Sequence, residues 1–222
     1  MPPISKVFVF LSMLLLAACG SNSQVPTSAT AIVGTKAIIK FQRSELVAEV
    51  TDVTDRLVTT EFSNWNGDIL FSRTEYRGLI PISGSEANGG QWELDFDEVQ
   101  LEAFFPLVPG KEIAFQGNLK NIDQGTSFDM WAHLEVVGEK VLDMPNGKRK
   151  VKVIEFTRQY LWKGKTKNAT EIIYYDPEYS MSLKKVTRER GGQTYWRVIR
   201  VDRPGNVSNT PPRQRRSGTV MI

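Results

Sequence analysis

The stretch KVLDMPNGKRKVKVIEF, residues 140–156, places an Asn-Gly pair between two runs of strand-forming residues. Asn and Gly tolerate the positive φ angles that the tightest hairpin turns require. After the pair, Val, Ile and Phe alternate with charged residues, which is typical of a β-strand. The stretch therefore predicts a β-hairpin whose turn is Asn146-Gly147.

The same pattern recurs along the chain. Asn66-Gly67 and Gly191-Gly192 also separate short runs rich in Val, Ile, Thr, Phe, Tyr and Trp. Weaker turn candidates are Gly138-Glu139 and Lys163-Gly164-Lys165, and Gly89-Gly90 marks a longer loop. Neither face of the expected strands is wholly polar, which favours sheets covered on both sides. We predict an all-β, single-domain protein of antiparallel hairpins that form a curved sheet, open barrel or sandwich, with little helix.

The best helical pattern is DFDEVQLEAFF, residues 95–105, where Phe96, Val99 and Phe104 would share one stripe. The following PLVPG, residues 106–110, would end a helix. The pattern fits a strand as well, so both interpretations stay open.

Length and composition agree with one globular domain. The 222 residues are 41% hydrophobic and 24% charged, with a net charge of +3. Acidic residues predominate before residue 100 and basic ones after it, which a solvated strand face explains as well as an anionic partner does. No nucleic-acid-binding motif accompanies the charge, so we expect no nucleic-acid partner.

The chain begins with an apolar run, residues 7–18, that is shorter than the roughly 20 residues needed to span a bilayer. The run has the length of an export signal. It ends in Leu16-Ala17-Ala18-Cys19, and Cys19 is the one cysteine of the sequence. This box resembles the lipobox of bacterial lipoproteins.

The resemblance implies that residues 1–18 are a signal peptide and that Cys19 carries a diacylglyceryl group and an N-acyl chain. Two or more chains anchor a protein stably to a membrane. Gly20, in place of the aspartate that tends to retain lipoproteins in the inner membrane, implies the periplasmic face of the outer membrane if the source is Gram-negative. Otherwise the expected location is the cell membrane, again by the lipid anchor.

Composition divides the rest of the chain. Residues 19–31 are small and polar and predict a flexible linker, and residues 32–202 predict the β-rich domain. Residues 203–222 contain three prolines and a basic cluster and predict a disordered basic tail.

From Phe105 onward, the order of features resembles a broad group of uncharacterised bacterial secreted β-rich domains. These features are FPLVPGK, a strand with Trp131, the hairpin at 146–147 and IIYYDPEYSMSLKK. A looser likeness is to half-barrel lipoprotein carriers, which wrap a curved sheet around an apolar cavity. A carrier would line its cavity with aromatic residues. The candidates are Trp65, Trp92, Trp131, Trp162 and Trp196.

No catalytic pattern stands out. His133 is the one histidine, and we expect it to be a strand residue paired with a neighbour rather than a base. Alternation puts Glu93, Asp95 and Asp97 on one strand face, where three carboxylates would suit a hydrolase or a Ca²⁺ site, although a solvated face is the simpler interpretation. We predict no enzyme, no metal and no cofactor other than the lipid on Cys19.

Basic residues gather in the second half of the chain. If the intervening chain pairs as a hairpin, they would form a patch for an anionic surface. The set is Lys148, Arg149, Lys150, Lys152, Lys163, Lys165 and Lys167.

Three functions follow from these features. The first is a non-enzymatic envelope lipoprotein whose β domain acts by protein or surface contacts. The second is a carrier of a lipid or lipoprotein in an apolar cavity, and the third is a hydrolase that uses residues 93–97. The expected partners are the membrane, through the anchor, and another envelope protein or anionic lipid.

Overall fold

The computed structural model describes residues 28–205, except 43, 87–88, 163–164 and 190–191. The expected signal peptide and Cys19 therefore lie outside the described residues. The first six strands are β1 (Lys36–Phe41), β2 (Ser44–Thr54), β3 (Leu57–Ser63), β4 (Ile69–Tyr76), β5 (Ile80–Ser85) and β6 (Gln91–Phe96). After helix α1 (Glu98–Glu102) come β7 (Glu112–Asn121), β8 (Thr126–Met144), β9 (Gly147–Trp162), β10 (Lys165–Asp176), β11 (Met181–Glu189) and β12 (Gly192–Asp202).

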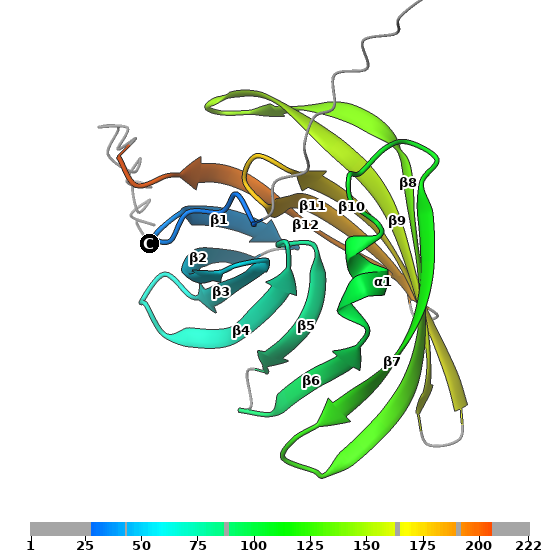
Figure 1. Ribbon diagram of the computed structural model, residues 1–222. Coiled ribbons are helices and arrows are strands. Elements are labelled where there is room, and N and C mark those ends of the chain that lie inside the picture. Colours follow the sequence, from blue (N-terminus) through cyan, green and yellow to red (C-terminus); the bar gives the residue numbers. More distant parts are fainter. Residues whose placement is uncertain (1–27, 43, 87–88, 163–164, 190–191, 206–222) are drawn as a thin grey trace, which may run out of the picture.

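Every strand pairs antiparallel with the next one along the chain, and β1 also pairs with β12. The sheet therefore closes into a barrel, seen in Figure 1 as one curved wall of arrows. This confirms the all-β class with antiparallel hairpins, and of the predicted arrangements the barrel is the one present. Closure gives every strand a partner on both sides over part of its length, which protects a β protein against edge-to-edge association.

The opening hairpin forms, but its loop lies one residue earlier than predicted. Met144 pairs with Gly147, so Pro145 and Asn146 form the loop and Gly147 takes the positive φ of 119°. Proline has no N–H and cannot hold a ladder position, which moves the loop onto Pro145. The Asn66-Gly67 turn also forms, within the longer loop 64–68.

Three further turn candidates have different outcomes. Trp162 pairs with Lys165, and Glu189 pairs with Gly192, so both predicted hairpins are present. The candidate turn at Gly138-Glu139 is wrong. Gly138 lies inside β8, where the register shifts against β9 and its φ is 156°. A glycine at a bulge bends a strand without ending it.

The segment 95–105 contains both a strand end and a helix. Strand β6 ends at Phe96, and the Asp97 side chain accepts a hydrogen bond from the Val99 N–H (2.9 Å), which caps α1. The helix lies in the concavity of the sheet (Figure 1), with Leu101 fully buried. Among the described residues, no helix is long and apolar enough to cross a bilayer.

The barrel interior holds two hydrophobic clusters. The larger one surrounds α1 and joins Leu101 and Phe104 to the inner faces of β8, β9 and β10, including Leu134, Ile154 and Ile173. The smaller one lies where β12 meets β1; its buried members are Ala37, Ile39, Ala48, Val151, Leu183, Val198 and Val201. The helix therefore fills one side of the barrel only.

One end of the barrel is closed by crossing turns. Gly78, at φ +66°, passes so close to the Ser180 carbonyl oxygen that an added Cβ would lie 1.7 Å from it. Residues 28–31, part of the expected linker, run along this end, where the Thr30 N–H donates to Ser180 Oγ (2.9 Å). The described residues thus contain the hydrophobic core and also the turns that close one end of the barrel.

Candidate functional site

The side of the barrel that α1 leaves unfilled contains a hollow of about 250 Å³. Most of its lining is apolar and comes from the inner faces of β1–β4, β11 and β12. The apolar lining residues are Ile39, Phe41, Leu46, Ala48, Phe62, Phe71, Met181, Trp196 and Val198. Protein interiors are normally packed as densely as organic crystals, so apolar walls around open space indicate a binding site.

A second hollow, of about 350 Å³, is lined by residues of β4–β11. Trp92, Leu94, Phe128 and Phe156 contribute its apolar surface. Arg73 and Lys185 line both hollows, so the two adjoin at these side chains.

Strand register brings further charges to the inside. Thr60 pairs with Arg73 and Val58 with Glu75, so Arg73 and Glu75 lie on the face of β4 that points inward like Val58. On the opposite wall, Lys185 is only 4% exposed, and its Nζ lies 3.4 Å from Glu75 Oε1. The interior is therefore mainly apolar, with a charged centre at the place where the two hollows adjoin.

The same centre includes a second ion pair and a cation without one. Arg158 Nη2 donates to Glu171 Oε1, and both side chains are mostly buried. Among the described residues, Arg73 has no carboxylate within 4.0 Å, and its guanidinium carbon lies 5.3 Å from the Phe71 ring centroid. Of these five charged side chains three are cations and two are carboxylates, so the centre is net positive.

Sequence reasoning missed these residues. The sequence did contain a signal, because Phe71, Arg73 and Glu75 are spaced two residues apart and therefore lie on the same face of their strand. That is the face on which apolar residues are expected. A charge in phase with the apolar face of a strand indicates a buried polar feature.

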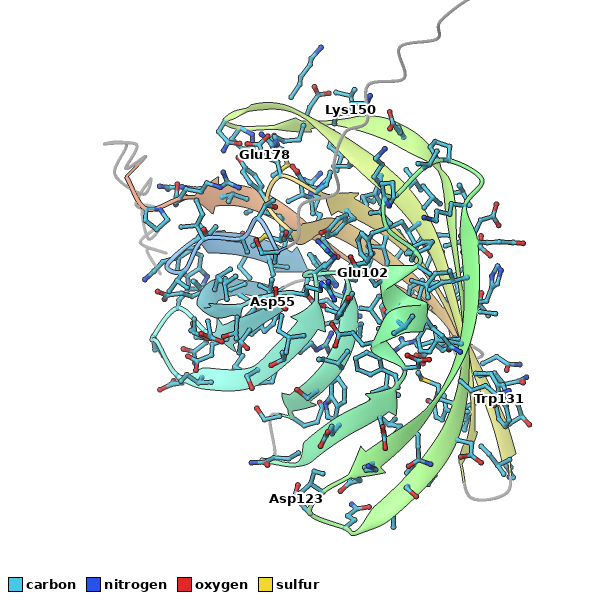
Figure 2. All side chains as sticks on the ribbon, viewed as in Figure 1. Asp55, Glu102, Asp123, Trp131, Lys150 and Glu178 are labelled. Carbon is cyan, nitrogen blue, oxygen red and sulfur yellow. The ribbon has the colours of Figure 1, made fainter. Side chains whose placement is uncertain are left out.

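The structure divides the predicted basic set into two groups. Lys148–Lys152 start β9, whereas Lys165 pairs with Trp162 and Lys167 with Tyr160 at its far end. The eight residue steps from Lys152 to Tyr160 extend about 26 Å. Figure 2 shows this separation. Lys150 lies near one end of the β8–β9 ribbon, and Trp131, which pairs with Gln159 next to Tyr160, lies toward the other. Lys163 lies outside the described residues.

Most of the first group is neutralised. Glu139 binds both Lys150 (2.6 Å) and Lys152, and these hydrogen bonds lower the pKa of Glu139 to about 2. Of the predicted basic set, the exposed side chains without an ion pair in the described part are Lys148, Lys165 and Lys167. For these three, contact with an anionic surface stays a prediction.

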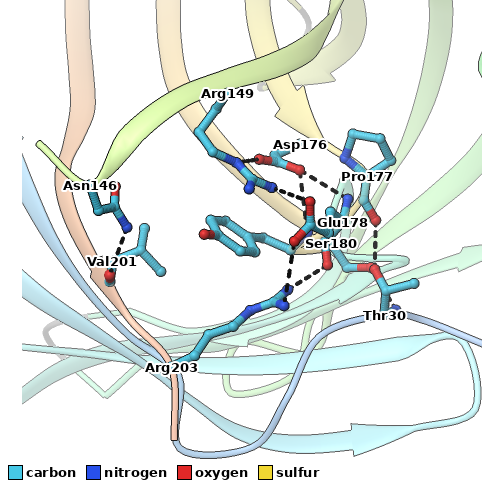
Figure 3. Close-up of polar contacts among 10 residues, drawn as sticks. Thr30, Asn146, Arg149, Asp176, Pro177, Glu178, Ser180, Val201 and Arg203 are labelled. Carbon is cyan, nitrogen blue, oxygen red and sulfur yellow. Dashed lines mark hydrogen bonds and ion pairs between the residues drawn. The ribbon is translucent and has the colours of Figure 1, made fainter. Parts of the chain in front are cut away.

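Arg149 belongs to a polar cluster at the closed end of the barrel (Figure 3). Its Nε donates to the buried Asp176 (2.8 Å) and its Nη2 to Glu178 (2.8 Å). Arg149 and Arg203 lie 4.0 and 4.1 Å from the ring centroid of Tyr179. The hydrogen bonds of Arg149, Asp176 and Arg203 to the turn 177–180 hold this end of the barrel together.

The predicted acidic face does not form a catalytic pair. Asp95 contacts Lys120 (3.0 Å), Asp97 caps α1, and Glu93 is exposed on β6. His133 is exposed, with Nε2 3.3 Å from Glu112 Oε2. No group of three or more His, Cys, Asp or Glu within the described ranges is arranged to hold a metal.

The five tryptophans occupy different environments. Trp196 lines the first hollow and Trp92 the second. Trp65 and Trp131 are exposed on the outside, and the side chain of Trp162 lies outside the described part. Two of the five therefore have the position that a ligand-binding barrel needs.

Comparison with known proteins identifies the fold alone. No protein-family model matches the sequence, and no curated protein matches it either. The structure is similar to a hypothetical lipoprotein, YmcC, from Escherichia coli, with a TM-score of 0.50, 10% identity, and coverage of 77% of this chain and 88% of that one. It is also similar to a presumed exported protein with a YmcC-like fold from Bacteroides fragilis, with a TM-score of 0.51, 12% identity, and coverage of 80% and 99%.

Proposed function

We propose that this protein is a non-enzymatic, lipid-anchored protein of the bacterial envelope that binds an apolar ligand inside its barrel. The observation that carries the proposal is the hollow between β1–β4, β11 and β12, whose walls are mainly apolar. A buried apolar surface without packing partners loses dispersion contacts, which a ligand restores.

The dimensions suit a ligand with a hydrocarbon chain. Small-molecule sites occupy roughly 300–1,000 Å³, and the two adjoining hollows together fall within this range. Phe62 and Phe71 stack with ring centroids 4.4 Å apart on the wall of the first hollow. Flat aromatic walls of this kind accommodate a flexible chain without demanding one shape.

The anchor is proposed from the sequence, with support from the fold. Leu16-Ala17-Ala18-Cys19 has the lipobox pattern, and Gly20 favours the periplasmic face of the outer membrane in a Gram-negative cell. The two proteins with a similar fold are described as a lipoprotein and as an exported protein. An anchored barrel would meet its ligand at the membrane that supplies it.

Native mass spectrometry tests the binding. A chain that begins at Gly20, exported through a cleavable signal without cysteine, contains the whole described barrel. We expect it to co-purify with lipid from the envelope. Purification without any bound lipid, together with no binding of added amphiphile, would favour the alternative function by protein or surface contacts.

Two substitutions on β2 locate the ligand. Leu46 points into the hollow and its neighbour Val47 points to the other face of β2. Leu46→Trp should fill the hollow and reduce the bound lipid severalfold, while Val47→Trp should leave it unchanged. Equal lipid content in both variants would place the ligand elsewhere.

Metabolic labelling with a clickable palmitate tests the anchor. The full-length chain should incorporate the label, and Cys19→Ser should abolish incorporation. An unlabelled mature chain, or an intact mass that still includes residues 1–18, would contradict the anchor without bearing on the barrel.

A further inference from the structure

We infer that the barrel selects an amphiphile with one acyl chain and an anionic head, a carboxylate or a phosphate, and holds the head at Arg73 and Lys185. This inference rests on the proposed binding function and adds the chemistry of the ligand. It is argued from the charges at the junction of the two hollows.

The first argument is the charge balance. Lys185 Nζ lies 3.4 Å from Glu75 Oε1, which is long for an ion pair. Arg158 forms its own ion pair with Glu171. Arg73 is half-buried and makes no ion pair within 4.0 Å among the described residues, and its guanidinium carbon lies 5.3 Å from the Phe71 ring centroid. A cation held in an apolar cavity is costly without a counter-charge, so an anionic group is favoured at this point.

The second argument is unsatisfied hydrogen-bonding capacity. Ser182 is 3% exposed and lines the first hollow, yet its Oγ has no partner among the described residues. Arg158, which lines the second hollow, has a buried Nε without a partner, although its Nη2 is bound to Glu171. Buried polar atoms are nearly always hydrogen-bonded. The O–H and the N–H are both donors, but each atom has less than 1 Å² of accessible surface, so a head group would reach them only after neighbouring side chains shift.

The third argument is the position of these groups relative to the apolar walls. Arg73 and Lys185 are the two side chains that line both hollows. From this point the first hollow continues along Phe62, Phe71 and Trp196. A head bound at the two cations therefore leaves the acyl chain against aromatic and aliphatic side chains. Lys185 Nζ also lies 5.6 Å from the Trp196 ring centroid, so the cation and the apolar wall are in contact.

Three probes with similar chains separate the contributions of head and tail. Palmitate carries a carboxylate, palmitoyl lysophosphatidylglycerol carries a phosphate, and monopalmitoylglycerol is neutral. Calorimetric titration of the delipidated chain from Gly20 measures each affinity. We expect both anionic probes, or one of them, to bind at least about tenfold more tightly than the neutral one. The stronger of the two identifies the head group.

Variants at Arg73 test its role. Arg73→Gln should weaken binding of the preferred anionic probe about tenfold and leave the neutral probe within about twofold. Arg73→Lys should restore part of the loss. Lys40→Gln, which removes an exposed cation from β1, is the matched control and should change neither affinity.

Glu75→Gln provides a test of opposite sign. It removes the carboxylate opposite Lys185 and should increase the affinity for the anionic probe. A variant that gains affinity cannot be explained by misfolding, because misfolding only lowers binding.

The outcomes distinguish the two levels of the proposal. Failure of all three probes to bind would overturn the proposed function together with this inference. Equal binding of neutral and anionic probes, or no effect of Arg73→Gln and Glu75→Gln on the anionic probe, would overturn the inference and leave an apolar-ligand site.

Discussion

Glu102 connects the interior helix to the strand ends at the closed side of the barrel. Tyr76 Oη donates to Glu102 Oε2 (2.5 Å), and Arg77 donates through Nε (3.1 Å) and Nη2 (2.7 Å). Burial by itself raises the pKa of the Glu102 carboxyl, but the hydrogen bonds from Arg77 and Tyr76 outweigh it, and the net pKa lies below the usual value. Figure 2 shows Glu102 within the molecule, at the end of α1.

Replacing Glu102 should destabilise the barrel in a pH-dependent manner. Because its folded-state pKa is depressed, its contribution is present above the unfolded pKa near 4.5 and is lost as pH falls through the folded value. Glu102→Gln should cost about 2 kcal/mol in urea unfolding at pH 7, and the difference from wild type should shrink at pH 3. The exposed pair of Glu98 with Arg56 (2.9 Å) is the control, and Glu98→Gln should cost less than about 1 kcal/mol. Equal losses would contradict the role assigned to Glu102.

Gly78 is required by sterics. Its φ of +66° disfavours any side chain, and the Ser180 carbonyl oxygen occupies the place of a Cβ. Gly78→Ala should lower the free energy of unfolding by about 3 kcal/mol or more. Gly67 also has a positive φ, +86°, but open space around it, so Gly67→Ala should cost about 1 kcal/mol. Thermal unfolding of the two variants measures the contrast, and similar melting temperatures would disprove the close crossing of the turns.

Among the elements, α1 is decisive for the shape of the interior. It has only five residues, and isolated helices of this length are unstable in water. Its stability must come from the Asp97 cap and from packing of Leu101 and Phe104 inside the barrel. The helix packs against the inner faces of β8–β10, and the first hollow lies at the opposite wall.

Truncation of the buried helical side chain tests this packing. Leu101→Ala should cost about 2–5 kcal/mol, because the side chain is fully buried and the rigid barrel wall relaxes little around the cavity. Val99 on the same helix is 77% exposed, so Val99→Ala should change stability by less than about 0.5 kcal/mol. Chemical denaturation followed by circular dichroism gives both values. A small effect of Leu101→Ala would mean that the helix is dispensable for the core.

The elements themselves were largely predictable, because hairpin turns depend on residues adjacent in sequence. Asn66-Gly67 and the 146–147 pair both mark true reversals of the chain. Gly138 was misassigned because a glycine serves a bulge as readily as a turn, and only pairing with β9 decides between them. The charged interior was not predicted, since Arg73 and Lys185 come together only through the register of strands distant in sequence.

At the scale of the whole molecule, closure joins the first strand to the last. Val198 of β12 pairs with Ile39 of β1, and both belong to the smaller hydrophobic cluster. The two clusters share strands: β9 contributes Ile154 to one and Val151 to the other. Neither cluster therefore has a separate set of strands that would persist alone. Members of the smaller cluster line the first hollow, and members of the larger cluster line the second.

This arrangement predicts a single cooperative unfolding transition. If the smaller cluster opened first, β1 and β12 would separate and expose unpaired strand edges in water, which is unfavourable. Leu183→Ala removes a fully buried side chain from that cluster and should cost about 2–4 kcal/mol. Tryptophan fluorescence, to which Trp196 beside this cluster contributes, and far-ultraviolet circular dichroism should report the same shifted midpoint in urea. If the fluorescence midpoint moved while the circular dichroism midpoint stayed at the wild-type value, the two sides of the barrel would be unfolding separately, and pairing of β1 with β12 would not couple them.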